Sequence, residues 1–365
     1  MEDNGTVKIE GLRKEFGDVL AVDGIDLEIG GGEFFTILGP SGCGKTTTLR
    51  CIAGLETPTA GDVYISGDRV THLPANKRRT SIVFQRWALF PHMDVASNIG
   101  FGLEMAGVPK DEREERIEDV LDLVELPGYG DRKPTELSGG QKQRVAMARS
   151  IVQEPDVLLL DEPLASLDRA LRERLQIELK NIQDELDITF IHVTHDQEEA
   201  LTMSDRIAVM NEGHLEQVGT VTELYEKPES RFVAEFVGET NLIEGSLTRS
   251  NGMLEIASDV NVQLSADVHD NPAGDSDSAV LTIRPESLRL VARNDLDSDN
   301  WWNGTVSNVV YKGSSTLYEV DIGERIVRIE KQRQKGERSF EEGAAVTVGF
   351  DADEGKLIRG AEGES

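Results

Sequence analysis

The stretch Gly39-Pro40-Ser41-Gly42-Cys43-Gly44-Lys45-Thr46 decides the fold of this chain. It follows a short apolar run, 34–38, and precedes residues 46–53, which we predict to form a helix that Gly54 closes. Glycines in such a loop let backbone N–H groups curl around phosphates, and the start of the following helix adds a favourable dipole. The strand–loop–helix context therefore predicts a phosphate-binding loop in an α/β domain.

Three residues at the end of the loop carry the expected nucleotide contacts. Lys45 is expected to reach the β- and γ-phosphates, Thr46 to bind Mg²⁺, and Thr47 to bond the α-phosphate. The alternative is a glycine-rich turn that binds nothing, which the complete pattern disfavours. ATP and Mg²⁺ are therefore the expected cofactors.

Two carboxylates follow a second apolar run, Leu158-Leu159-Leu160-Asp161-Glu162. If this run is a strand beside the phosphate loop, Asp161 can hold Mg²⁺ through water, and Glu162 is the best general base for an attacking water. The alternative is a salt-bridged acidic pair at a strand end. The phosphate loop upstream favours the catalytic interpretation.

Apolar patterning predicts the remaining elements of the first domain. Buried strands are expected at 80–84, 157–160, 190–193 and 207–210. The stretch 86–154 is predicted to be mainly helical, with one amphipathic helix through Ile117, Val120, Leu121 and Val124 that stops at Pro127-Gly128. A further amphipathic helix carries Leu171, Leu175, Leu179, Ile182 and Leu186.

Composition places limits on the class of protein. The chain has 365 residues, enough for two domains, and no apolar run approaches the ~20 residues that span a bilayer. Its start lacks the basic and apolar regions of a signal peptide, so we expect a cytoplasmic protein that reaches a membrane only through partners. The two cysteines, Cys43 and Cys51, match no zinc spacing, and no disulfide is expected.

The formal net charge is −30 and is spread along the chain. Residues 1–240 hold 45 acidic and 25 basic side chains, and residues 241–365 hold 23 and 13. The charge is therefore no acidic tail, and we favour a surface adapted to concentrated salt, which screens self-repulsion. The balance also argues against nucleic acid as a partner.

The run Leu137-Ser138-Gly139-Gly140-Gln141, together with the loop and the carboxylates, resembles one family, the ATP-binding cassette (ABC) ATPases. The resemblance implies that two chains sandwich ATP between the phosphate loop of one and this run of the other. Ser138 and Gly140 would bind the γ-phosphate of the opposite chain, and Ser138 with the Gly139 and Gly140 N–H groups lies at a predicted helix start, a natural anion site. A homodimer is expected, and a heterodimer with a close relative is the alternative.

Four further positions take roles from the same resemblance. Gln85 would contact Mg²⁺ and the attacking water, and His195 would be the switch histidine that touches the γ-phosphate. Ser166-Leu167-Asp168 matches the loop that crosses the dimer interface. Phe16 matches the aromatic that stacks on adenine, although the family often has Tyr or Trp there, and a core Phe is the alternative.

The chain changes character near residue 238. Short β-branched runs at 260–264, 280–283, 305–311, 325–329 and 345–350 predict small barrels. The phrases Glu235-Phe236-Val237-Gly238-Glu239-Thr240-Asn241 and Ile283-Arg284-Pro285-Glu286 resemble the OB-like (TOBE) regulatory domain of importers. The predicted domains are thus an ABC domain over 1–237, with a helical subdomain at about 86–154, and a TOBE domain over 238–365.

An importer ATPase would work at the cytoplasmic face of the membrane with two permease subunits and an extracellular substrate-binding protein. The surface 85–101, with Trp87, Leu89 and Phe90 expected to be exposed, would accept a permease helix. Residues 200–206 and 311–313 are similar to spermidine/putrescine importer ATPases, so polyamine ranks first as substrate. Ferric iron ranks second, and sugar and sulfate stay open. The C-terminal domain would bind a regulator or serve dimerisation and packing.

Rival classes fit less well. ABC proteins of translation or DNA repair usually carry two cassettes or a long coiled-coil insertion, which this chain lacks. A kinase or GTPase with the same loop would lack the 137–141 run. A non-enzymatic binding module is disfavoured by Glu162 and His195, and a turnover assay would decide the point.

Overall fold

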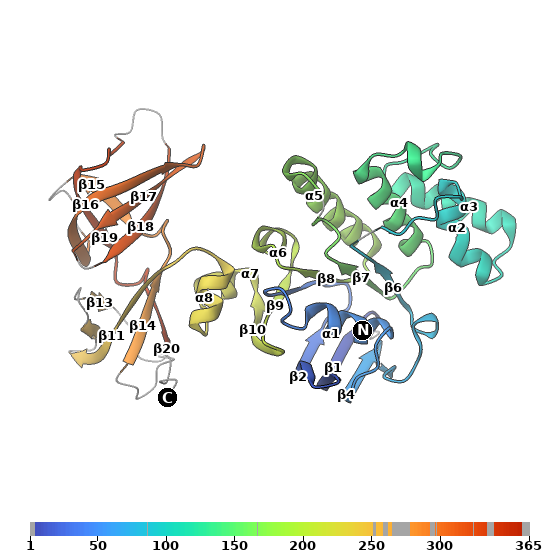
Figure 1. The fold of residues 1–365 in the computed structure, drawn as a ribbon, viewed down its shortest axis with the longest axis horizontal. Coiled ribbons are helices and arrows are strands. Elements are labelled where there is room, and N and C mark those ends of the chain that lie inside the picture. Colours follow the sequence, from blue (N-terminus) through green and yellow to red (C-terminus); the bar gives the residue numbers. More distant parts are fainter. Residues whose placement is uncertain are drawn as a thin grey trace. The chain divides into compact units, whose positions relative to one another are not determined.

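The computed structural model describes residues 4–85, 87–165, 167–250, 253–257, 262–264, 278–292, 296, 298–323, 325–333 and 339–359 (Figure 1). The chain forms two compact units, Met1–Val221 and Thr222–Ser365. The domain boundary predicted from the sequence, 237/238, falls at the end of helix α8 (Arg231–Val237), which this division assigns to the second unit.

A six-stranded sheet forms the centre of the first unit. Its strand order is β10 (His214–Thr220), β9 (Arg206–Asn211), β3 (Phe34–Leu38), β8 (Thr189–Thr194), β7 (Val157–Asp161) and β6 (Thr80–Val83). All neighbours are parallel except the β9–β10 pair. Every residue of β3, β7 and β8 is buried, which explains their unbroken apolar runs and confirms the strands predicted for this part of the chain.

Helices follow β3, β7 and β8, and the sequence patterns predicted the first two of these helices but not the third. Helix α1 (Lys45–Ala53) follows β3 and ends at Gly54, which has a left-handed conformation. Helix α5 (Arg169–Leu186) follows β7, and α6 (Gln197–Met203) follows β8. The loops that follow β3, β7 and β8 therefore emerge at one edge of the parallel sheet, where sites of α/β folds are usually found.

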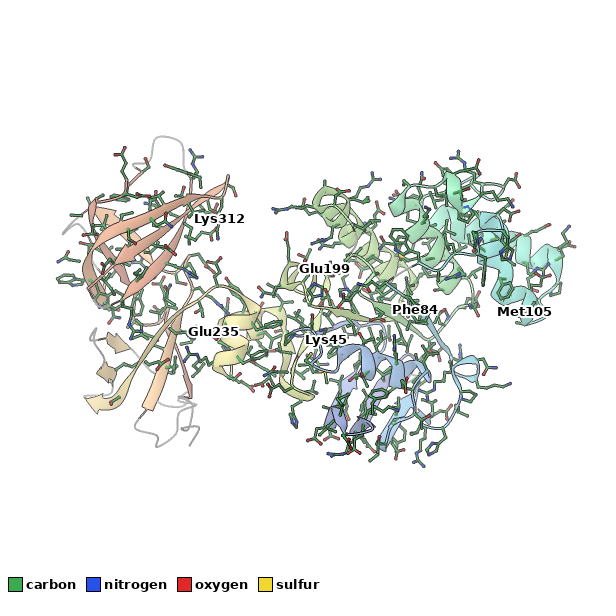
Figure 2. The ribbon with its side chains drawn as sticks, viewed as in Figure 1. Lys45, Phe84, Met105, Glu199, Glu235 and Lys312 are labelled. Carbon is green, nitrogen blue, oxygen red and sulfur yellow. The ribbon has the colours of Figure 1, made fainter. Side chains whose placement is uncertain are left out.

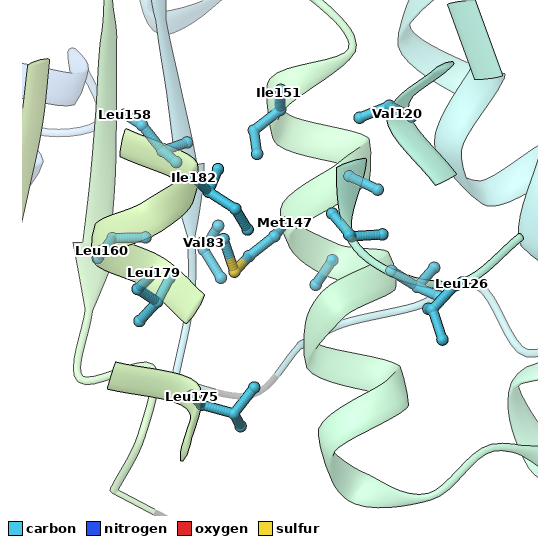
Figure 3. Close-up of a cluster of buried hydrophobic side chains, with 14 of the residues drawn as sticks. Val83, Val120, Leu126, Met147, Ile151, Leu158, Leu160, Leu175, Leu179 and Ile182 are labelled. Atoms are coloured by element: carbon cyan, nitrogen blue, oxygen red, sulfur yellow. The ribbon is translucent and has the colours of Figure 1, made fainter. Parts of the chain in front are cut away.

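A helical region connects β6 to β7. It contains α2 (Val95–Met105), α3 (Lys110–Leu123) and α4 (Gly139–Ile151), with a 3₁₀ turn at Pro134–Glu136. Helix α3 ends at Leu123, before the Pro127-Gly128 stop predicted from the sequence, because Val124 already leaves helical geometry as its C-cap. In Figure 3, Met147 of α4 points towards Val83 and Leu179, which joins the helical region to the sheet and α5 in one core.

A second, antiparallel sheet in the first unit was not predicted. Its order is β2 (Val19–Ile29), β1 (Val7–Phe16), β4 (Ala60–Ile65) and β5 (Asp68–Arg69). Buried positions alternate with exposed ones along β1 and β2, so one face packs into the core shared with α1 while the other meets solvent. Bulges interrupt the β1–β2 register, which breaks the clean alternation that a sequence pattern would reveal.

The second unit is largely β-structure that follows two short helices, α7 (Val221–Glu226) and α8. One sheet has the order β13 (Val262–Leu264), β12 (Met253–Ala257), β11 (Asn241–Ser250), β14 (Ser278–Ile283) and β20 (Lys356–Arg359). The other has the order β15 (Arg289–Ala292), β19 (Ala345–Phe350), β16 (Asn300–Tyr311), β17 (Ser315–Asp321) and β18 (Ile326–Gln332). The five predicted strands correspond to β13, β14, β16, β18 and β19, although residues 260 and 261 lie outside the described residues.

Candidate nucleotide-binding and catalytic site

The phosphate loop joins the end of β3 to the start of α1. Lys45 is almost fully buried, and its Nζ donates to the carbonyl oxygens of Gly39 and Pro40, both at 2.8 Å. Gly44 has a φ of 108°, and a Cβ there would collide with the carbonyl oxygen of Ala21. Only glycine fits at this position, so the loop backbone stays open to an anion. Figure 2 labels Lys45 at the start of α1.

Thr46 and Asp161 meet at the ends of neighbouring segments. The Thr46 hydroxyl donates to Asp161 Oδ1 at 3.1 Å. Burial raises the pKa of the Asp161 carboxyl, against the opposing hydrogen bond from Thr46. A buried carboxylate that faces a hydroxyl gains stability from a nearby cation, and oxygen donors are the ligands that Mg²⁺ prefers. The donor set at this position therefore fits a magnesium ion.

The structure brings together Gln85, Glu162 and His195 from three different segments. Gln85 Nε2 donates to Glu162 Oε2 at 3.3 Å, and His195 Nδ1 lies 3.1 Å from Glu162 Oε1. Glu162 has a φ of 47°, which is unusual for a non-glycine residue, and its N–H donates to Val193 O at 3.0 Å. Glu162 follows β7 directly and lies next to Asp161, so its carboxylate is placed where it could accept a proton from a water molecule.

The run 137–141 begins helix α4. The Ser138 side chain accepts from the Gln141 N–H at 3.3 Å, and Gln141 Oε1 accepts from the Ser138 N–H at 2.9 Å. This capping box confirms the predicted helix start. A Cβ at Gly140 would lie 3.2 Å from the Leu171 side chain, so the glycine also permits close packing against α5.

Two other candidate residues lie at the ends of elements. Asp168 caps α5 by accepting from the Leu171 N–H at 3.1 Å, and Ser166 before it lies outside the described residues. Phe16 ends β1 with 45% of its surface exposed, and Lys14 Nζ lies 4.7 Å from the ring centroid. Because Phe16 is exposed, it is not a core residue. Stacking on adenine requires such an accessible ring.

A pocket of about 600 Å³ opens beside Gln85. Its lining includes Trp87, Leu89 and Pro91 from the segment after β6 and Pro134 from the helical region. The expectation that Trp87, Leu89 and Phe90 are exposed is wrong, because all three side chains are partly buried. Phe90 packs on Phe101 with ring centroids 5.0 Å apart, which explains its burial. Arg86 lies outside the described residues.

Sequence reasoning missed a cluster of polar side chains, two of them buried, near His195. Its members are Arg172 of α5, His192 of β8 and Glu199 of α6. His192 and Glu199 are almost fully buried. The available signal was a histidine inside an apolar strand and an acidic pair in a short helix, and neither pattern stands out without the fold.

Comparison with known proteins agrees with the geometry. Residues 22–165 match the ABC transporter family, and residues 281–358 match the TOBE domain. The spermidine/putrescine import ATP-binding protein PotA of Rubrobacter xylanophilus is 48% identical over 98% of this chain and 94% of its own length. The protein of the same name from Thermobifida fusca is 52% identical over 82% of this chain and 78% of its own.

Two solved structures share the fold of the first unit. A dimeric ATP-binding cassette, MJ0796, bound to ADP and Pi has a TM-score of 0.52 and 32% identity, and covers 59% of this chain and 98% of its own. The cbiO1 component of the cbiONQ ABC transporter complex from Clostridium perfringens has a TM-score of 0.57 and 32% identity over 60% and 89%.

The fold and the site thus define an ATP-binding cassette ATPase of the transporter class with a C-terminal TOBE domain. Within that class, the chain belongs to the family of spermidine/putrescine import ATP-binding proteins. No helix among the described residues has the length and apolar character needed to cross a bilayer.

Proposed function

We propose that this chain hydrolyses ATP to drive uptake of spermidine and putrescine through partner permeases. The hydrolysis step is supported by the contacts of Gln85 and His195 with Glu162. Glu162 is adjacent in sequence to Asp161, which bonds Thr46 after the phosphate loop. The substrate class rests on the names of relatives that match nearly the whole chain. In this proposal the chain supplies the energy and the partner subunits supply the selectivity for the solute.

Each site residue has a role in this proposal. Lys45 exchanges its two loop carbonyls for the β- and γ-phosphates, and Thr47 bonds the α-phosphate. Thr46, Asp161 and Gln85 hold Mg²⁺, which neutralises phosphate charge when bound. Glu162 accepts a proton from the attacking water, and His195 donates towards the γ-phosphate while it orients Glu162.

The working unit in this proposal is a homodimer. Ser138, Gly139, Gly140 and Gln141 at the start of α4 complete the phosphate site of the partner chain, and the 166–168 loop crosses the interface. A helix N-terminus favours a bound anion such as a γ-phosphate. The dimeric state of the MJ0796 structure supports this arrangement.

The remaining partners follow from the class of importer. Two permease subunits hold the dimer at the cytoplasmic face of the membrane, and an extracellular binding protein delivers the solute. The pocket beside Gln85 is the proposed dock for a short permease helix, because it combines apolar walls with a residue of the catalytic centre. We also propose that the −30 charge adapts the chain to a salt-rich cytoplasm.

Uptake of labelled spermidine, ferric iron and a sugar in cells that lack this gene tests the proposal. Wild type should restore spermidine uptake alone, and Glu162→Gln should restore nothing. Lys8→Ala, a change on the exposed face of β1, is the matched control and should restore uptake fully. Restoration of iron or sugar uptake instead would overturn the substrate, and rescue by Glu162→Gln would overturn the mechanism.

A further inference from the structure

Hydrogen bonds hold the residues before and after His195, Thr194 and Asp196. The Asp196 N–H donates to the Thr194 hydroxyl oxygen at 3.0 Å. Asp196 Oδ1 then accepts the N–H groups of Glu198 at 2.9 Å and Glu199 at 3.3 Å, which caps α6. The histidine side chain itself is half exposed, so its position depends on these two neighbours.

The Glu199 side chain contacts this turn at Thr194. Its side chain is 2% exposed, and Oε2 accepts the Thr194 hydroxyl at 2.7 Å (Figure 2 labels Glu199). His192 Nε2 lies 3.5 Å from the same oxygen. His192 Nδ1 lies 3.3 Å from Thr36 Oγ1, which already accepts a proton from Ser204 at 2.6 Å. His192 thus lies between Thr36 on one side and the Glu199 carboxyl on the other.

Arg172 connects this arrangement to a different loop. Its Nη1 donates to Asp196 Oδ2 at 2.9 Å, and its Nη2 donates to the carbonyl oxygen of Leu167 at 3.3 Å. Its Nε lies 3.8 Å from Glu199 Oε1. One guanidinium thus lies against Leu167, the residue before Asp168, and against two acidic residues after His195, Asp196 and Glu199. Lysine cannot reproduce this fork geometry.

A purely stabilising ion pair is a weak explanation for these contacts. Arg172 and Asp196 are partly exposed, and exposed ion pairs typically contribute little to stability. The cluster instead links the two segments that the catalytic proposal needs to move together. The guanidinium of Arg172 is a direct hydrogen-bonded connection between the Leu167 carbonyl oxygen and Asp196, which caps α6.

We propose that Arg172 and Glu199 are positioning residues that hold His195 in its working orientation and couple it to the Leu167–Asp168 loop. This inference rests on the proposed function, in which that loop reaches the partner chain. Neither residue is assigned a nucleotide contact in the proposed function. They act by fixing Thr194 and Asp196, the two neighbours of the histidine, when the dimer closes.

Steady-state ATPase measurements on Thr194→Val and Arg172→Lys test this. Each variant should lower kcat about tenfold, the effect expected from losing one hydrogen bond that orients a catalytic group, while KM for ATP changes less than about twofold. Glu199→Gln should keep more activity than Glu199→Ala, because its amide oxygen still accepts the Thr194 hydroxyl.

Thr71→Val is the matched control. Thr71 is a buried threonine far from the nucleotide site whose hydroxyl accepts the Val63 N–H at 3.0 Å and donates to Asp62 at 2.8 Å, the same pattern as Thr194. It should lower the melting temperature by a similar amount with wild-type kcat. A stability effect alone would therefore appear in both variants.

The outcomes separate this inference from the function it rests on. Wild-type kcat in folded Thr194→Val and Arg172→Lys would overturn the positioning role, as would equal activity of Glu199→Gln and Glu199→Ala. If Thr194→Val does not fold, the Arg172→Lys and Glu199 comparisons decide. ATP turnover by Glu162→Gln, measured in parallel, would overturn the catalytic proposal itself. If Glu162→Gln has no turnover and Thr194→Val has wild-type turnover, only the positioning role is overturned.

Discussion

At the residue scale, burial shifts the pKa values of His192 and Glu199 in opposite directions. Burial lowers the pKa of His192 to about 3 and raises the pKa of Glu199 to about 7. Below pH 6.5 the unfolded chain binds a proton at His192 that the folded chain refuses, so stability falls as pH falls. From pH 4.5 to 7 the folded chain alone binds a proton at Glu199, so stability falls as pH rises. The two effects oppose each other between pH 4.5 and 6.5.

Glu199→Gln is expected to expose the histidine effect. Its free energy of unfolding should drop by up to ~3 kcal/mol between pH 6.5 and 4.5 relative to wild type over the same range, since each pKa unit corresponds to ~1.4 kcal/mol. Urea unfolding at several pH values measures the difference. His192→Phe should show the opposite slope, with stability rising as pH falls from 7 to 4.5. Parallel pH curves for wild type and Glu199→Gln would contradict the account.

Lys45, Asp161 and Glu162 could be assigned from the sequence itself, because Lys45 follows the strand β3 and the two carboxylates lie at the end of β7. Gln85, His195 and Phe16 took their roles from the family resemblance. Arg172 and His192 could not be found in this way. Their contacts join α5, β8 and α6, and only the fold brings those elements together.

At the scale of elements, a glycine of the phosphate loop and a glycine after helix α2 differ in what a side chain would meet. Gly44 combines a φ of 108° with the Ala21 carbonyl oxygen directly where a Cβ would stand, whereas Gly107 has a φ of 79° and open space around it. Gly44→Ala should therefore lose ~2 kcal/mol or more of stability together with ATP binding, and Gly107→Ala only the ~1 kcal/mol that left-handed strain costs. Thermal unfolding and nucleotide calorimetry of both variants measure this. Equal losses would show that the close approach to Ala21 does not matter.

Elements differed in how well sequence patterns predicted them. Strands buried on both faces were found, because an unbroken apolar run has few other interpretations. Strands β1 and β2 were missed, because bulges shift their alternation, and β17 was missed although most of it is buried. Helix α3 ended early because a residue of its apolar stripe, Val124, serves as its cap.

For the whole molecule, the surface charge determines the response to salt. The net charge of −30 is distributed over both halves of the sequence. Self-repulsion between such charges is screened when the Debye length falls to ~3 Å near 1 M salt. The melting temperature should rise by more than ~5 °C between 0.05 M and 1 M KCl, which corresponds to a gain of ~1–2 kcal/mol for domains of this size. Equal melting temperatures would contradict a salt-adapted surface.

The central claim of the account is that one complete catalytic centre requires two chains. Light scattering of Glu162→Gln with MgATP tests it most directly, because a carboxamide cannot accept the proton and the ATP-bound state persists. We predict a dimer with ATP and a monomer without it, and Lys45→Ala combined with Glu162→Gln should remain monomeric in both. A monomer in ATP at every salt concentration would contradict the two-chain site.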